Sequence, residues 1–216
     1  AHGVQRTGLL EQVGGAGDDL QAAGAAQLLQ RLVVQRQQLP VLAAQDQQRL
    51  AVASGVGPGL VGDAEQHPHL PVLDGWHGDH SRMFGVGEVK RKAERLMEVT
   101  YEAMMAGIAA VKPGARFGDI GGAISEIARL NRYSVVDDFC GHGLGRLFHD
   151  APEVVHAARA GTGPELRPGM FFTIEPMINL GKPWAKVLGD GWTAVTRDKS
   201  LSAQFEHSIA ITETGN

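Results

Sequence analysis

A single cysteine, Cys140, occurs in the 216 residues, so no disulfide can form within the chain. This scarcity fits a reducing compartment, because disulfides accumulate in oxidising ones. The sequence also lacks any run of about 18 apolar residues, which predicts that no helix spans a membrane. Its first residues lack the basic-then-apolar pattern of a secretory signal. Together these absences predict a cytoplasmic protein.

An excess of positive charge is missing as well. The formal net charge is −4, which gives no reason to expect nucleic acid or an anionic membrane surface as the main partner. The apolar fraction of 43% is ordinary for a soluble globular protein, and 216 residues suffice for one full domain or two small ones.

The N-terminal third is deficient in a further way. Before Trp76 the chain contains no Lys, Asn, Phe, Tyr, Ile, Met, Trp or Cys, whereas every glutamine except Gln204 lies between Gln5 and Gln66. A core needs large apolar side chains to fill its volume. Residues 1–70 are therefore expected to be poorly ordered, with some helix over 20–52.

Two explanations of residues 1–70 stay open. Most of the missing residue types have A/T-rich codons, so the segment could be a GC-rich gene read in a wrong frame or strand and joined to a genuine sequence near residue 70. It could equally be a low-complexity, largely disordered extension. Translating the flanking DNA in the other frames would separate the two.

From residue 71 onward, hydrophobic periodicity predicts an α/β (α+β) domain over residues 71–216. Apolar residues recur at three- and four-residue spacing in two segments and alternate in several others. The expected elements are strand–turn–strand over 73–84, a helix over 88–111, a second helix ending near Asn131, and strands over 134–136, 170–179, 192–196 and 202–212.

Two of these strands carry carboxylates. Alternation places Glu175 on the same face as Thr173, and Glu206 on the same face as Gln204. A carboxylate in a β-prone strand is costly to bury unless it is paired or bound to a metal. Both glutamates are therefore candidate ligands.

A glycine-rich stretch, Cys140-Gly-His-Gly-Leu-Gly-Arg-Leu-Phe-His149, places two histidines seven residues apart. Its glycines allow the backbone to approach a ligand closely. Asp79, His142, Glu175 and Glu206 together offer three carboxylates and one imidazole, a set that suits Mn, Fe, Co or Zn. Bridging carboxylates could hold two such ions about 3.5–4 Å apart, as in two-metal hydrolases.

Five motifs carry a resemblance to a known family. They are Asp74-Gly-Trp-His-Gly-Asp-His-Ser-Arg-Met-Phe84, the glycine-rich stretch, Pro168-Gly-Met-Phe-Phe-Thr-Ile-Glu-Pro-Met177, Asp190-Gly-Trp-Thr193 and Ser202-Ala-Gln-Phe-Glu-His207. Residues 73–216 resemble type I methionine aminopeptidase. The resemblance implies the creatinase-like pita-bread fold, a curved antiparallel sheet flanked by helices, with its N-terminal half incomplete here. It also implies a cytoplasmic, monomeric enzyme that removes the initiator methionine from nascent polypeptides, with the ribosome as a further partner.

The resemblance assigns a role to each matched residue. Asp79 and Glu206 match bridging metal ligands, His142 matches the histidine ligand, and Glu175 matches a ligand that also passes a proton from water to the leaving amine. Two further matches concern the substrate. His149 matches a histidine that stabilises the developing oxyanion, while Phe148 and Trp192 match walls of the methionine pocket.

The sequence departs from the family at one metal ligand. The family has an aspartate eleven residues before the position of Asp79, where this chain has Pro68. Proline cannot ligate a metal, and it removes a strand hydrogen-bond donor. Nothing in residues 1–67 matches the family's further catalytic histidine. The departure predicts one retained ion instead of two, and weak or absent activity.

Other assignments remain open beside this one. One is an X-Pro peptidase of the same fold, against which the Ser202–Glu206 signature argues. Another is a catalytically inactive pita-bread protein that binds ribosomes or other proteins. Among the remaining histidines, His156 and His207 have no matched role and are expected to be structural, and His67 and His69 are interpreted as a chance pair.

Overall fold

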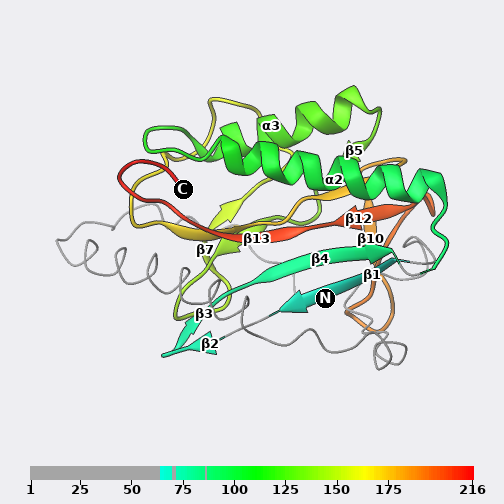
Figure 1. Ribbon diagram of the computed structural model, residues 1–216, viewed down its shortest axis with the longest axis horizontal. Coiled ribbons are helices and arrows are strands. Elements are labelled where there is room, and N and C mark those ends of the chain that lie inside the picture. Colours follow the sequence, from blue (N-terminus) through cyan, green and yellow to red (C-terminus); the bar gives the residue numbers. More distant parts are fainter. Residues whose placement is uncertain (1–63, 70–71, 86) are drawn as a thin grey trace.

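The computed structural model of the protein describes residues 64–69, 72–85 and 87–216 (Figure 1). The expectations for residues 1–63, including helix over 20–52, lie outside these ranges. The described elements are β1 (Ala64–His69), β2 (Val72–Leu73), β3 (Trp76–His77), β4 (His80–Gly85), α2 (Arg91–Ala109), α3 (Phe117–Leu130), β5 (Ser134–Val135), β6 (Gly141–Gly143), β7 (Asp150–Val154), β8 (Phe171–Ile174), β9 (Met177–Asn179), β10 (Ala185–Val187), β11 (Ala194–Thr196), β12 (Ser202–Gln204) and β13 (Glu206–Ala210).

The largest sheet has six strands in the order β1-β4-β13-β8-β6-β7. All its pairings are antiparallel, so strands far apart in sequence lie side by side. A three-stranded sheet of order β12-β9-β5 continues from it, and β10–β11 and β2–β3 form two small hairpins. The expected antiparallel sheet flanked by helices is confirmed.

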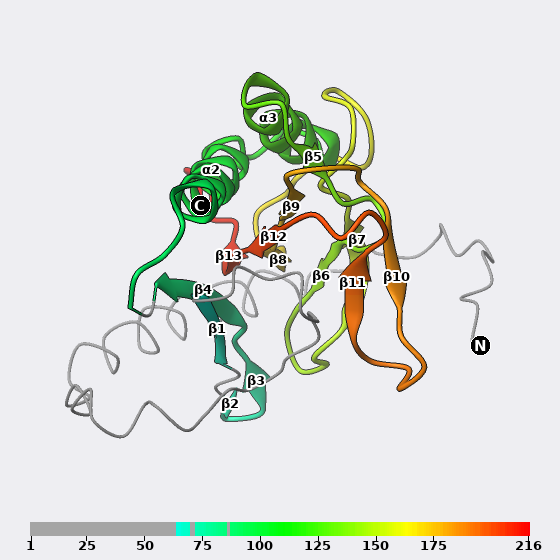
Figure 2. The ribbon, with the colours of Figure 1, turned by 90° about the vertical axis from the view of Figure 1, so that its right-hand side faces the viewer.

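Helices α2 and α3 cover one face of the sheets (Figure 2). The buried positions of α2 recur at helical spacing and include Leu96, Val99, Ala103 and Met104. The two helices approach closely at Gly107, where an added Cβ would lie 2.8 Å from Ile124. This face provides the hydrophobic core, which stabilises the fold by removing apolar surface from water. Neither described helix is long and apolar enough to cross a membrane.

Two expected strands are each divided in the structure. The strand expected over 170–179 is interrupted at Glu175 and Pro176, and the one expected over 202–212 at Phe205. In both cases the first and second parts belong to different sheets, so the chain passes from one sheet to the other at these points. At the first of these points, Pro176 lacks the N–H that a strand ladder requires. The interruption therefore frees Glu175 from the regular pleat.

Several element boundaries differ by a few residues from the expectation. Helix α2 begins at Arg91 instead of residue 88, and β11 begins at Ala194 instead of residue 192. The expected strand–turn–strand over 73–84 contains a hairpin, β2–β3, before β4, with positive φ angles at Asp74 and Gly75 in its turn. A glycine accepts that conformation without steric cost. The glycine-rich stretch also begins as a strand, β6.

Candidate metal centre

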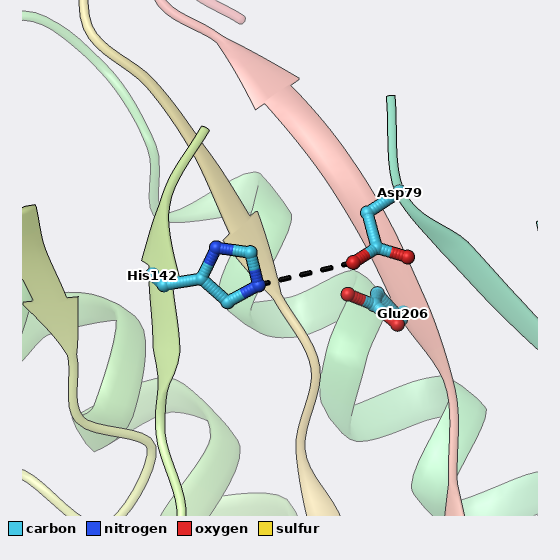
Figure 3. Close-up of side chains that lie close together, drawn as sticks. All are labelled: Asp79, His142 and Glu206. Atoms are coloured by element: carbon cyan, nitrogen blue, oxygen red, sulfur yellow. Dashed lines mark ion pairs between the residues drawn. The ribbon is translucent and has the colours of Figure 1, made fainter. Parts of the chain in front are cut away.

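Three side chains from distant parts of the chain meet on one face of the main sheet (Figure 3). Asp79 directly precedes β4, His142 is the middle residue of β6, and Glu206 begins β13. One ligand atom from each lies within 4.8 Å of the other two. Antiparallel pairing of β4 with β13, which aligns Ser81 with Glu206, brings the two carboxylates together.

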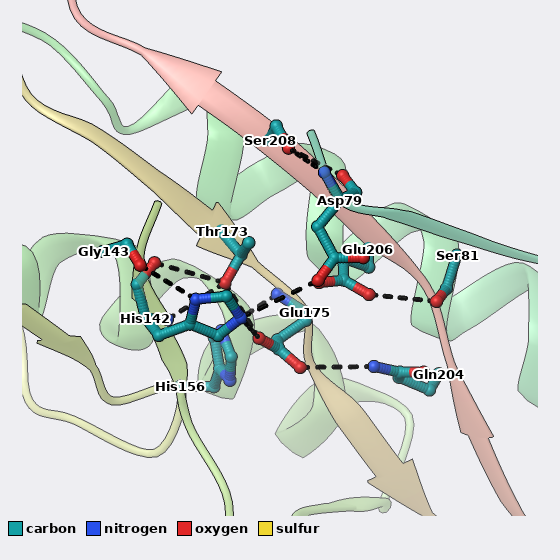
Figure 4. A network of polar contacts seen from close by, with 10 residues as sticks. All are labelled: Asp79, Ser81, His142, Gly143, His156, Thr173, Glu175, Gln204, Glu206 and Ser208. Atoms are coloured by element: carbon teal, nitrogen blue, oxygen red, sulfur yellow. Dashed lines mark hydrogen bonds and ion pairs between the residues drawn. The ribbon is translucent and has the colours of Figure 1, made fainter. Parts of the chain in front are cut away.

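Glu175 lies beside this group. Its Oε1 is 3.6 Å from His142 Nε2, and Asp79 Oδ2 is 3.8 Å from the same nitrogen. The break between β8 and β9 thus places a carboxylate at the edge of the site (Figure 4). All four residues that the sequence singled out as ligands are therefore neighbours.

Hydrogen bonds orient His142 as a ligand. Its Nδ1 lies 3.0 Å from the carbonyl oxygen of Gly143, which can only accept, so Nδ1 carries the hydrogen. Nε2 is left with its lone pair directed at the carboxylates, the form in which imidazole binds a metal. The backbone N–H of His142 donates to Thr173 Oγ1 at 3.0 Å, and that hydroxyl donates to Glu175 Oε1 at 2.8 Å.

Glu206 is buried with only one of its oxygens satisfied. Ser81 Oγ donates to Oε2 at 2.9 Å, while Oε1 has no hydrogen-bond partner and the residue is 5% exposed. A buried polar atom without a partner costs about 1–3 kcal/mol. A cation in contact with Oε1 would remove this cost, so the residues present fit a divalent metal ion.

The charges of the site lead to the same conclusion. Burial, together with the charges of Glu175 and Asp79, raises the pKa of Glu206 to about 10. Burial and the charge of Asp79 raise the pKa of Glu175 to about 7, and burial raises that of Asp79. Three carboxylates this close cannot all be ionised in a site without positive charge. A divalent cation supplies that charge.

His149 and Phe148 lie next to the ligand histidine. The ring of His149 meets that of His142 edge-on at 4.3 Å between centroids, and the Phe148 ring is 5.6 Å away. Burial lowers the pKa of His149, and the neighbouring His142 adds to the effect. A neutral His149 retains one N–H donor beside the centre.

Trp192 and Pro68, the two other residues that the sequence singled out, do not belong to this cluster of rings and ligands. Trp192 is 73% exposed in the turn between β10 and β11, where its backbone N–H donates to Asp190. Its role as a pocket wall stays a prediction. Pro68 occupies edge strand β1 opposite Ser81, a position that tolerates a missing N–H donor.

Sequence reasoning missed one contact of His156. The residue was expected to be structural, and it is 2% exposed with a pKa lowered to about 3 by burial. Its Nε2 accepts the backbone N–H of Glu175 at 3.1 Å. Helix α3 packs closely on the loop that carries Val155 and His156. A Cβ on Gly121 would lie 2.5 Å from the Val155 carbonyl oxygen, so only glycine allows this approach. The repeated glycines of residues 118–122 were the one feature of the sequence that could have indicated this close packing.

Comparison with known proteins agrees with this geometry. The pattern of metallopeptidase family M24 matches residues 70–213. A methionine aminopeptidase from Rickettsia prowazekii is 58% identical over 146 residues, which are 67% of this chain and 56% of that protein. The chain thus spans little more than half the length of this relative.

Solved structures show the same fold. The crystal structure of methionine aminopeptidase from Rickettsia prowazekii matches with a TM-score of 0.69 and 54% identity, covering 70% of this chain and 62% of that one. Prolidase from Pyrococcus furiosus matches with a TM-score of 0.55 over 71% of this chain and 40% of its own, and at 24% identity this likeness concerns the fold alone. On its sequence pattern and its close relatives, the chain belongs to metallopeptidase family M24.

Proposed function

We propose that this protein removes the N-terminal methionine from nascent proteins and peptides by metal-dependent hydrolysis. The observation that carries the proposal is the meeting of Asp79, His142 and Glu206 within 4.8 Å, with Glu175 beside them. Membership of a metallopeptidase family and relatives named methionine aminopeptidase support the substrate. We further propose a cytoplasmic monomer that meets its substrates at the ribosome.

The metal would be held by Asp79, His142, Glu175 and Glu206. Their oxygen and nitrogen donors suit Mn, Fe, Co or Zn. When bound, such an ion supplies Lewis acidity and lowers the pKa of water toward about 7. Pro68 stands where the resemblance expects a further ligand, so we propose one ion per chain and a reduced rate.

Glu175 is proposed to move the proton. Its Oε1 receives a hydrogen bond from Thr173, and Gln204 Nε2 donates to its Oε2 at 3.4 Å. A carboxylate held in this way can accept the proton of the attacking water and deliver it to the leaving amine. General acid–base groups of this kind contribute about 10²–10⁴-fold to a rate.

His149 and two apolar side chains are proposed to act on the substrate. A neutral imidazole beside the centre can donate its N–H to the carbonyl oxygen as negative charge develops there. Phe148 already packs against His77 and His142, with centroids 5.8 and 5.6 Å away, and would form one wall for the methionine side chain. Trp192 would form the other wall.

The test is release of free methionine from Met-Ala-Ser by the full chain with Mn²⁺ or Co²⁺. We expect slow, metal-dependent release, with Leu-Ala-Ser and Met-Pro peptides as matched controls and one tightly bound ion per chain. Absence of release together with no bound ion would overturn the proposal in favour of a binding protein. Turnover as fast as that of a complete methionine aminopeptidase would refute the reduced rate. Preferential cleavage before proline would identify an X-Pro peptidase.

A further inference from the structure

At Asp79 a side chain replaces the strand ladder. The backbone pairing of β13 with β4 reaches His207 and His80, and one step further along the same register Ser208 lies opposite Asp79. There the Ser208 hydroxyl makes both contacts: the backbone N–H of Asp79 donates to Oγ at 2.8 Å, and Oγ donates to the Asp79 carbonyl oxygen at 2.7 Å (Figure 4). One hydroxyl thus holds both backbone polar groups of a proposed metal ligand.

The same arrangement recurs at His142, on the other side of the centre. Strands β6 and β8 pair at Gly143 and Phe172, and one step further along that register Thr173 lies opposite His142. The backbone N–H of His142 donates to Thr173 Oγ1 at 3.0 Å, and the His142 carbonyl oxygen lies 3.5 Å from the same hydroxyl. A hydroxyl therefore holds the backbone of this ligand too.

The two hydroxyl residues are themselves neighbours. Ser208 of β13 and Thr173 of β8 are directly paired, so each adjoins the other on one side and a ligand residue on the other side. The resulting row across the sheet is Asp79, Ser208, Thr173 and His142. The Oδ2 and Nε2 atoms of the residues at its two ends lie 3.8 Å apart. The two hydroxyls thus connect the strands whose ligands must meet.

We propose that Ser208 is a positioning residue for the metal centre, because it fixes the backbone of Asp79 and so holds this carboxylate near His142. With ligand distances of about 2.0–2.2 Å, neighbouring ligand atoms around an ion lie roughly 3.0–3.5 Å apart. The observed 3.8 Å is close to that separation. A hydroxyl suits the role because it both accepts and donates, whereas alanine would leave two backbone groups without this partner. The inference rests on the metal centre proposed above, and Ser208 acts on it through Asp79.

The test compares the Mn²⁺ affinity of serine variants of the full chain by calorimetry. Ser208→Ala is expected to lower the affinity about 10–100-fold, and Ser208→Thr, which retains the hydroxyl, should recover most of the loss. Ser134→Ala is the matched control, because the Ser134 hydroxyl is also half-buried but donates to the Gly181 carbonyl oxygen in another sheet region. It should leave the affinity unchanged. A Ser208→Thr chain as weak as Ser208→Ala would contradict the role of the hydroxyl.

A double-mutant cycle shows whether Ser208 acts through Asp79. Asp79→Asn removes the ligand charge, so adding Ser208→Ala to that chain should change Mn²⁺ affinity much less than it does in the unmodified chain. Fully additive losses would overturn the inference, since they would indicate a general weakening of the fold. If Ser208→Ala does not fold, Ser208→Cys, a weak donor and acceptor of similar size, takes its place and should also lower the affinity.

This inference and the proposed function have different contradicting outcomes. Absence of Mn²⁺ binding by the unmodified chain would overturn the metal centre and the role of Ser208 with it. Mn²⁺ binding that Ser208→Ala and Ser208→Cys leave unchanged would overturn the role of Ser208 alone.

Discussion

The two faces of the β4–β13 pair differ in chemistry although the same two strands build them. One face carries the carboxylates of Asp79 and Glu206, which are 7% and 5% exposed, and the other carries the half-buried imidazoles of His80 and His207. On the first face a buried carboxylate oxygen lacks a donor, whereas on the second the Nδ1 atoms of the two rings share a hydrogen bond. Alternation along a strand is enough to separate these two environments.

The comparison teaches that burial decides which face needs a cation. Carboxylates taken out of water repel one another, and their pKa values rise until a positive charge is supplied. Imidazoles can remain neutral and pair without an ion. The carboxylate face is therefore expected to depend strongly on metal, whereas the imidazole pair is held by its own hydrogen bond.

Removing the proton-transfer group should produce the largest effect. Glu175→Gln keeps the size of the side chain but cannot take up a proton, so we expect kcat/KM for Met-Ala-Ser to fall by about 10²–10⁴. Glu126→Gln is the matched control, since Glu126 is an exposed partner of Arg129 on α3. A loss of less than threefold would show that Glu175 carries no proton.

His149→Ala tests whether the neighbour of His142 acts on substrate instead of metal. Loss of one oxyanion donor costs about 10²–10³ in kcat. Metal affinity measured by calorimetry should stay the same, because His149 is proposed to contact the substrate and not the ion. His149→Gln, which retains a donor, should recover part of the rate. A loss of bound metal in His149→Ala would reassign this residue as a ligand.

Thr173→Val tests the support of the carboxylate face. The substitution removes the donor to Glu175 and the acceptor for the His142 N–H, so Mn²⁺ affinity should fall about 10–100-fold. Thr196→Val is the control, because Thr196 is also buried but donates to the Ser200 carbonyl away from the centre. Equal losses of Mn²⁺ affinity in both variants would contradict a specific role.

His156→Phe tests the buried contact behind Glu175. An unpaired Glu175 N–H should cost about 1–3 kcal/mol in the free energy of unfolding measured by urea denaturation. Metal affinity should also fall, because the backbone of a ligand loses its anchor. Ser125→Ala, which removes only a bond to the His156 carbonyl, should leave metal affinity unchanged. If Ser125→Ala lowered metal affinity as much as His156→Phe, the His156 imidazole would have no specific role in anchoring Glu175.

The smallest expected effect is the pH dependence of the metal-free protein. Glu175 has a raised pKa of about 7, so the stability it contributes is complete below its ordinary value of 4.5 and is lost as the pH rises through 7. The raised pKa of Glu206 acts in the same direction, whereas the lowered pKa of His156 acts in the opposite direction up to its ordinary value of 6.5. The melting temperature in the presence of a chelator should therefore decrease between about pH 6.5 and 8. Addition of Mn²⁺ should abolish the decrease, and a melting temperature that rises with pH in the chelated protein would contradict it.

Much of the fold follows from local patterns. The apolar positions of α2 and α3 recur with the helical period, so both helices were predictable to within a few residues. The interruptions of two strands at Glu175 and Phe205 could not be predicted in this way, because they depend on which sheet each half of the strand joins. Hydrogen-bonded pairing across the chain, and not alternation alone, ends those strands.

The amino-acid sequence alone determined which residue types are available as ligands: Asp79, His142, Glu175 and Glu206 stand in recognisable motifs. Only the tertiary structure decided that Ser81 and Thr173 support them, that His156 anchors Glu175, and that His80 faces His207. The contacts of Ser81 and His80 join residues more than 120 positions apart. No local pattern encodes such contacts, because strand register is set by the packing of the whole sheet against its helices.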